Sequence, residues 1–129
     1  MKKQIIQSNQ APSPIGPYSQ AVKAGGFLFV SGQIALNPAT GELVMKSIEA
    51  ETRQVMENIR SILAQAGVSF DSIVKTSIFL TDMSYFPRVN EIYSGYFSSE
   101  FPARETIQVA GLPKNVNIEI SVIAISSSN

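Results

Sequence analysis

The sequence contains no histidine, no cysteine and no tryptophan among its 129 residues. Without imidazole or thiol side chains, the chain cannot form a zinc site of the usual kind, an iron–sulfur cluster or a thiol nucleophile. A Ser-His-Asp triad and imidazole acid–base catalysis are excluded for the same reason. Any chemistry must therefore depend on carboxylates, arginine, lysine, tyrosine, hydroxyls, amides or backbone groups, and we expect no metal and no other cofactor.

Excess charge and long apolar runs are also missing. The 10 lysines and arginines balance the 10 aspartates and glutamates, so the formal net charge is zero. Because a domain that binds nucleic acid usually carries a basic excess, we expect no nucleic-acid partner. The apolar runs, such as residues 118–125, have the length of strands and fall far short of the roughly 20 residues that span a bilayer. The sequence therefore predicts a cytoplasmic protein with no membrane partner.

Periodicity in the sequence predicts an α+β fold within one domain over residues 1–129. Alternating or β-rich segments predict strands at 3–7, 18–24, 27–34, 72–81, 104–110 and 117–125. Apolar residues spaced by three and four predict helices over 48–66 and 85–98. In the first helix, five charged residues fall outside the apolar stripe: Glu49, Glu51, Arg53, Glu57 and Arg60. The order β-β-β-α-β-α-β-β favours a mixed β-sheet with two helices packed on one face.

Two helices cannot cover both faces of this sheet. Apolar residues nevertheless occur on both sides of several predicted strands: Phe29, Ile107, Val109, Ile123 and Ile125. An uncovered apolar sheet face usually marks an association surface, so we expect a homo-oligomer. The alternative is that the alternating isoleucines and valines of the last strand are buried at an edge within one chain.

Arg104 and Glu119 are the residues best suited to chemistry. Arg104 opens a strand directly after Pro102-Ala103, and a guanidinium can hold a carboxylate through two parallel hydrogen bonds. Glu119 lies in a strongly apolar strand, where a partly buried carboxylate can act as a general base or position a water molecule. The ordinary alternatives are a surface arginine at a strand end and an exposed glutamate on an edge strand. Thr106 shares the face of Arg104 by strand alternation.

The spacing of these two residues limits how they could act together. If residues 104–110 and 117–125 pair as a hairpin, Gln108 faces Glu119, and Arg104 lies about 13 Å from Glu119 along the sheet. A substrate of three or four carbons could not easily touch both side chains within one chain. Either the register differs from this hairpin, or the site combines residues from two chains.

Weaker signals come from a loop, a strand end and the second helix. Tyr18 follows the proline-stiffened segment 11–17. Ser31 and Gly32 end a β-rich strand, where their backbone amides could donate to an anion. Asn90 could orient a neighbouring group. The ordinary alternatives are a half-buried tyrosine, a turn at a strand end and an exposed asparagine on a helix.

Short motifs follow one another along nearly the whole chain, at residues 11–21, 29–34, 58–59, 79–83, 89–93, 102–104 and 118–120. The most specific part is the pairing of Pro102-Ala103-Arg104 with the later Ile118-Glu119-Ile120. Together they resemble the Rid family (reactive intermediate deaminases, YjgF-type proteins), and specifically its RidA-like members. The resemblance implies a chorismate-mutase-like α+β subunit, three of which form a homotrimeric barrel with clefts between neighbours.

The resemblance also implies a reaction, the hydrolysis of 2-imino acids such as 2-iminobutanoate and 2-iminopropanoate, or their enamine tautomers, to 2-keto acids and ammonium. Such intermediates leave pyridoxal-phosphate-dependent dehydratases. By resemblance, Arg104 would hold the substrate carboxylate and Glu119 would position or activate the attacking water. Five further residues would line the cleft: Tyr18, Ser31, Gly32, Asn90 and Thr106.

Alternatives to this function come from the same resemblance. A non-enzymatic regulatory protein could bind 2-keto acids or related metabolites in the same cleft, with Arg104 as the carboxylate clamp. A translation-inhibiting ribonuclease role, attached to some family members, fits poorly with zero net charge and the absence of histidine. Many RidA-like proteins carry cysteine where this chain has Thr106, and threonine should serve if that position only lines the pocket.

Overall fold

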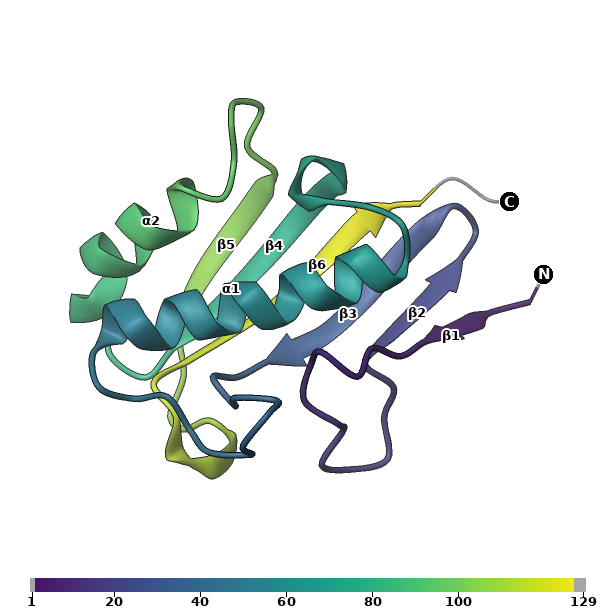
Figure 1. The fold of residues 1–129 in the computed structure, drawn as a ribbon. Helices are drawn as coiled ribbons and strands as arrows, with labels where there is room; N and C mark the ends of the chain where they lie inside the picture. The colour runs from purple at the N-terminus through teal and green to yellow at the C-terminus, as the bar shows by residue number, and fades with distance from the viewer. Residues whose placement is uncertain (1, 127–129) are drawn as a thin grey trace.

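Six strands form one mixed sheet in the computed structural model, which describes residues 2–126 (Figure 1). The strands are β1 (Gln4–Ile6), β2 (Ala21–Ala24), β3 (Phe27–Gln33), β4 (Ile73–Leu80), β5 (Ala103–Gln108) and β6 (Ile118–Ile125). The helices are α1 (Ile48–Gln65) and α2 (Phe86–Ser94). The predicted fold class and element order are therefore confirmed.

The helix boundaries follow from local chemistry. Ser47 caps α1, since its hydroxyl oxygen accepts a hydrogen bond of 3.0 Å from the backbone N–H of Ala50. Gly67 follows the end of α1 with φ +78°, a left-handed conformation that favours glycine. The second helix is shorter than predicted, because a 3-10 turn capped by Asp82 precedes it and Gly95 follows its last residue. Within residues 2–126, neither helix combines the length and apolarity needed to cross a membrane.

The strand order in the sheet is β1-β2-β3-β6-β4-β5. β4 and β5 are parallel, whereas all other neighbours are antiparallel. The hairpin considered for residues 104–110 and 117–125 does not form, because β4 lies between β5 and β6. The chain between β4 and β5 contains α2, and such a crossover connection joins parallel strands.

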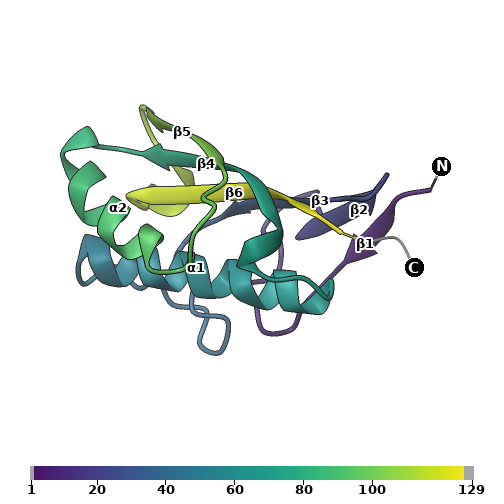
Figure 2. The ribbon, with the colours of Figure 1, turned by 90° about the horizontal axis from the view of Figure 1, so that it is seen from above.

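Both helices pack on the same face of the sheet (Figure 2). Strand residues that face the helices are almost completely buried: Leu28, Ile78, Leu80, Ile118 and Ile120. The opposite face, called the helix-free face below, exposes five large apolar side chains by 44–54%: Ile5, Phe27, Phe29, Ile107 and Ile125. The uncovered apolar face predicted from the sequence is thus present on the chain.

A buried asparagine ties α1 to the segment that follows β3. Asn58 is 1% exposed, and its Nδ2 donates to the carbonyl oxygens of Ile34 and Leu36 over 3.1 and 2.9 Å. Gln54 Nε2 donates to Asn58 Oδ1 over 2.9 Å, which fixes the orientation of the amide. The segment after β3 is irregular, so these bonds replace those that a strand partner would supply.

We expect Asn58→Ala to lower the free energy of unfolding by about 2–3 kcal/mol, because two buried carbonyls lose their donors. Urea unfolding followed by circular dichroism measures this change. Arg53→Ala removes an exposed side chain from the same helix and should change the free energy by no more than about 0.5 kcal/mol. Equal effects of the two substitutions would contradict the role given to Asn58.

Candidate active site

A pocket of about 320 Å³ opens beside the end of β3 and the start of β6. Its lining comes from three parts of the chain: the proline-rich loop before β2, the end of β3 with the residues after it, and the region around β6. The lining residues are Pro12, Ser13, Ile15, Tyr18, Gln20, Ser31, Gly32, Gln33, Ile34, Leu36, Pro113 and Glu119. Four predicted site residues therefore meet here: Tyr18, Ser31, Gly32 and Glu119.

The carboxylate of Glu119 lies directly against the backbone of Gly32. A Cβ atom at residue 32 would lie 2.7 Å from the carboxyl carbon of Glu119, so a side chain there would push the carboxylate out of this position. The pairing of β3 with β6 shifts register between Val30 and Gln33, and such irregularities often re-aim side chains near functional sites. Glycine at position 32 therefore leaves the space that the Glu119 carboxylate occupies.

Burial raises the pKa of Glu119 above its ordinary value, and no other cause contributes. The side chain is half-buried, and no hydrogen bond or cation among residues 2–126 offsets the cost of its charge. A carboxylate with a raised pKa and free acceptor positions is a better proton acceptor than an exposed one. The arrangement can therefore orient a water molecule and take a proton from it.

The loop that carries Tyr18 is held by Gln20, which is 2% exposed. Gln20 Oε1 accepts from the backbone N–H of Ser8 over 2.6 Å, and its Nε2 donates to the carbonyl oxygen of Pro12 over 2.8 Å. The Ser31 hydroxyl donates to the carbonyl oxygen of Ser19 over 2.6 Å, which joins the loop to the end of β3. Sequence patterns do not single out Gln20, because no periodicity separates a buried glutamine in a loop from an exposed one.

Arg104 lies outside this pocket, on the side of β5 that faces α2. Its guanidinium carbon is 5.5 Å from the ring centre of Phe86 and 5.1 Å from that of Tyr93. Stacking on two aromatic faces fixes the plane of the guanidinium. None of the ion pairs among the described residues involves Arg104. Its donors therefore have no carboxylate partner among residues 2–126, which suits the binding of an anionic group.

Phe86 and Tyr93 form an aromatic cradle for Arg104. The hydroxyl of Tyr93 fixes its ring in place by donating to Thr76 Oγ1 over 2.9 Å. Burial raises the pKa of Tyr93, which keeps its hydroxyl protonated as a donor; the Thr76 hydrogen bond and the Arg104 charge oppose that rise.

Thr106 lies two residues after Arg104 on the same face, and its buried Oγ1 has no hydrogen-bond partner in residues 2–126. Asn90 is half-buried on α2, spaced to share a face with Phe86 and Tyr93.

The predicted site residues thus form two groups on opposite faces of the sheet. In the strand register, Arg104 aligns with Thr76 and Val122, whereas Glu119 aligns with Phe79 and Ile107. This register places the Cα atoms of Arg104 and Glu119 about 14 Å apart, and their side chains leave the sheet on opposite faces. One chain cannot hold a small substrate against both Arg104 and Glu119.

The fold and the site define a class: small α+β domains with two helices on one face of a mixed sheet and with candidate residues divided between its faces. A family model described as Endoribonuclease L-PSP matches residues 8–126. The chain belongs to this family, the Rid family, whose members include proteins named RutC.

Similar proteins have been named as enzymes and as regulators. The chain is 46% identical to the human 2-iminobutanoate/2-iminopropanoate deaminase, over 95% of this chain and 90% of that protein. It is 54% identical to AldR of Lactococcus lactis, named as a regulator, over 93% of this chain and 95% of that protein. The crystal structure of RidA from an Antarctic Psychrobacter bacterium matches with a TM-score of 0.91 and 43% identity, covering 95% of this chain and 98% of that one.

The placement of Glu119 predicts that the wild type is less stable near neutral pH than Glu119→Gln. A carboxyl whose pKa is raised in the folded chain stabilises the fold below its ordinary pKa of 4.5 and loses that contribution as the pH rises. We expect Glu119→Gln to unfold at a higher temperature than the wild type at about pH 7, and the difference to vanish near about pH 4. Thermal unfolding at both pH values measures the difference in unfolding temperature. A wild type as stable as the variant at neutral pH would contradict the raised pKa of the half-buried Glu119 carboxyl.

Proposed function

We propose that the chain is an imine deaminase, which hydrolyses 2-iminobutanoate, 2-iminopropanoate and their enamine tautomers to 2-keto acids and ammonium. The observation that supports this proposal most is the Glu119 carboxylate, which lies half-buried in a pocket beside Gly32. Its burial raises the pKa of the group. The chain also presents Arg104 with no carboxylate partner among residues 2–126. A cation for the substrate carboxylate and a carboxylate for water are the two groups that this reaction needs.

In the proposed reaction, Arg104 holds the substrate carboxylate through parallel hydrogen bonds. Glu119 orients a water molecule and takes its proton as the water oxygen bonds to the imine carbon. The proton then passes to the nitrogen, and the carbon–nitrogen bond breaks as the new hydroxyl gives up its own proton, through Glu119, to the departing ammonia. The products are a 2-keto acid and ammonium. An iminium carbon is already electrophilic, so orientation and one carboxylate suffice without a metal or an imidazole. Tyr18, Ser31, Gly32, Asn90 and Thr106 line the cleft.

The two groups of site residues meet if neighbouring chains combine. We propose a homotrimer in which the helix-free faces pack into a central barrel and each cleft takes Arg104 from one chain and Glu119 from the next. This assembly buries the apolar side chains that one chain leaves exposed, which are Phe29, Ile107 and Ile125 among others. It also accounts for a site divided between two faces of one sheet. We place this activity in the cytoplasm, where dehydratases supply such imines.

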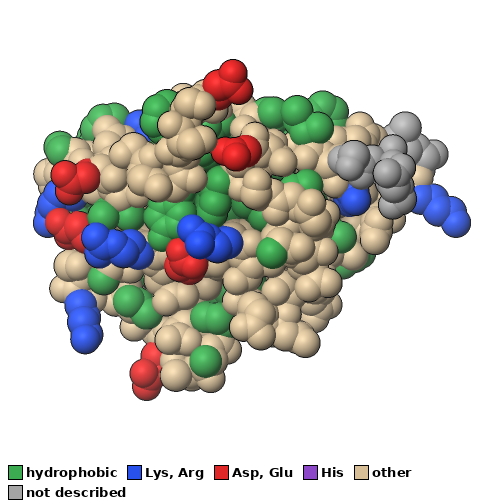
Figure 3. Space-filling view, turned by 45° about the horizontal axis from the view of Figure 1, so that its top comes forward, with side chains coloured by type: hydrophobic (Ala, Val, Ile, Leu, Met, Phe, Trp, Pro, Cys, Tyr) green, Lys and Arg blue, Asp and Glu red, His purple; other side chains and the backbone are tan. Residues whose placement is uncertain are grey.

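A second candidate function is a regulatory protein that binds 2-keto acids in the same cleft, which the similarity to AldR favours. Nucleic-acid cleavage, suggested by the description of the family model, has less support. The chain has zero net charge and no histidine. Figure 3 shows acidic and basic side chains interspersed on one side of the molecule, without the basic stripe that phosphate binding requires.

An assay coupled to a threonine dehydratase, which follows keto-acid release from the imine, tests the enzymatic function. We expect the wild type to accelerate release and Arg104→Ala to abolish the acceleration, because the substrate carboxylate loses its partner. Arg104→Lys should retain only part of the activity, since lysine cannot form two parallel hydrogen bonds. A wild type that binds 2-oxobutanoate without changing the rate would contradict the deaminase and favour the regulatory protein.

Light scattering tests the assembly separately. We expect the wild type to have about three times the 14.0 kDa mass of the chain, and Phe29→Glu to shift toward the monomer, because a charge is placed on the helix-free face. Arg53→Glu, on the exposed side of α1, is the matched control and should leave the mass unchanged. A wild type of 14.0 kDa would contradict the proposed assembly.

A further inference from the structure

Glu51 is a buried carboxylate to which the proposed reaction gives no role. It lies in the first turn of α1, and its exposed fraction is 0%. The placement of Glu51 outside the apolar stripe of the helix, expected from the sequence, is therefore wrong. An ionised side chain removed from water is costly unless hydrogen bonds replace its hydration. The partners of Glu51 therefore show what this burial achieves.

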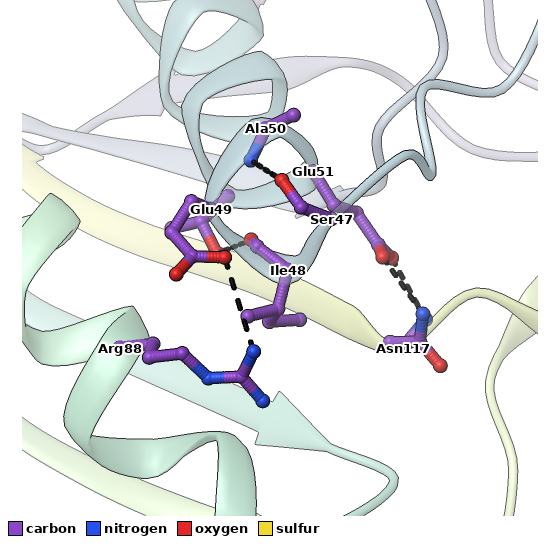
Figure 4. Close-up of polar contacts among 8 residues, drawn as sticks. Ser47, Ile48, Glu49, Ala50, Glu51, Arg88 and Asn117 are labelled. Carbon is purple, nitrogen blue, oxygen red and sulfur yellow. Dashed lines mark hydrogen bonds and ion pairs between the residues drawn. The ribbon is translucent and has the colours of Figure 1, made fainter.

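The hydrogen bonds to Glu51 come from the residues where β6 begins (Figure 4). The backbone N–H and the Nδ2 of Asn117 donate to its two carboxylate oxygens over 2.8 and 2.9 Å. The backbone N–H of Ile118 donates over 3.3 Å. The cap of α1 is supplied by Ser47, so the Glu51 side chain is available to join the helix to the strand.

This contact lies directly before Glu119 in the chain. Ile118 is fully buried on the helix side, and Glu119 projects from the opposite face toward Gly32. Glu51 thus holds β6 from the helix side at the point where the strand presents Glu119 on the other side. The N-terminus of α1 also favours a negative charge in this turn.

We propose that Glu51 is a positioning residue, which holds the start of β6 and thereby fixes the Glu119 carboxylate against Gly32. The proposal rests on the proposed function, which gives Glu119 its role. Glu51 is not among the lining residues of the pocket, so it acts through β6. A displacement of about 1 Å at a reacting group can reduce a rate by about 100-fold, so a small movement of the strand is sufficient.

Three variants separate positioning from stability. Glu51→Ala removes both carboxylate oxygens that accept from Asn117 and Ile118, whereas Glu51→Gln keeps one oxygen for their backbone amides. Val55→Ala is the matched control, because Val55 is fully buried one turn further along α1. Its truncation leaves a core cavity but removes none of the hydrogen bonds to β6.

Rates are compared below the unfolding temperature of all variants. We expect Glu51→Ala to lower the rate of keto-acid release by about 10- to 100-fold. Glu51→Gln and Val55→Ala should stay close to the wild type. The Kd for 2-oxobutanoate should remain nearly unchanged in all three variants, because Arg104 and its aromatic cradle are untouched.

A second measurement does not depend on catalysis. Carbon-13 NMR follows the titration of the Glu119 carboxyl, and Glu119→Gln assigns its signal. Tyr18 is the other titratable side chain among the lining residues. In Glu51→Ala the pKa of Glu119 should fall toward its ordinary value as the carboxylate becomes more exposed, and in Val55→Ala it should stay raised.

The outcomes distinguish this proposal from the proposed function. A wild type without deaminase activity overturns the proposed function, and the titration still decides the role of Glu51. An active wild type overturns the positioning role if Glu51→Ala keeps both its rate and its raised pKa, or if Val55→Ala loses as much activity. If Glu51→Ala does not fold, Asn117→Ala serves instead, since it removes one of the hydrogen bonds to Glu51. It should lower both the rate and the pKa of Glu119, by smaller amounts than Glu51→Ala. An unchanged rate and an unchanged pKa in Asn117→Ala overturn the proposal.

Discussion

The alternation of side chains across a β-sheet is the constraint on which the site depends. Arg104 and Glu119 belong to strands of the same sheet, but their side chains leave it on opposite faces. The helices cover the face on which Arg104 stacks with Phe86 and Tyr93. The other face carries Glu119 beside exposed apolar side chains. A chain built in this way can supply both groups to one small molecule only by combining with a copy of itself.

Buried polar side chains hold the pocket around Glu119 in shape. Gln20 ties down the proline-rich loop, Asn58 holds the segment after β3, and Glu51 holds the start of β6. Each side chain is at most 2% exposed, and each bonds to backbone groups that a regular strand partner does not satisfy. The pocket is therefore formed by irregular segments, and its precision depends on hydrogen bonds from the packed layers behind it.

Local periodicity predicted the fold correctly in several respects. The order of the elements, the extent of α1 and the uncovered apolar face all follow from patterns within short segments. The neighbours of β5 could not be predicted in this way, because strand pairing depends on how α2 crosses the sheet. The burial of Glu51 was missed for a similar reason, since its partner Asn117 lies 66 residues away along the chain. Residue chemistry singled out Arg104 and Glu119, whereas their placement on opposite faces required the structure.

Subunit mixing shows whether Arg104 of one chain and Glu119 of another act in the same cleft. Arg104→Ala and Glu119→Gln are each expected to be inactive alone. When the two variants are unfolded together and refolded as a mixture of equal parts, the Glu119→Gln chains supply the arginine and the Arg104→Ala chains supply the carboxylate. We expect about one quarter of the clefts to become intact, so that about one quarter of wild-type activity returns. A mixture as inactive as its components, with the oligomer re-formed, would contradict a site shared between two chains.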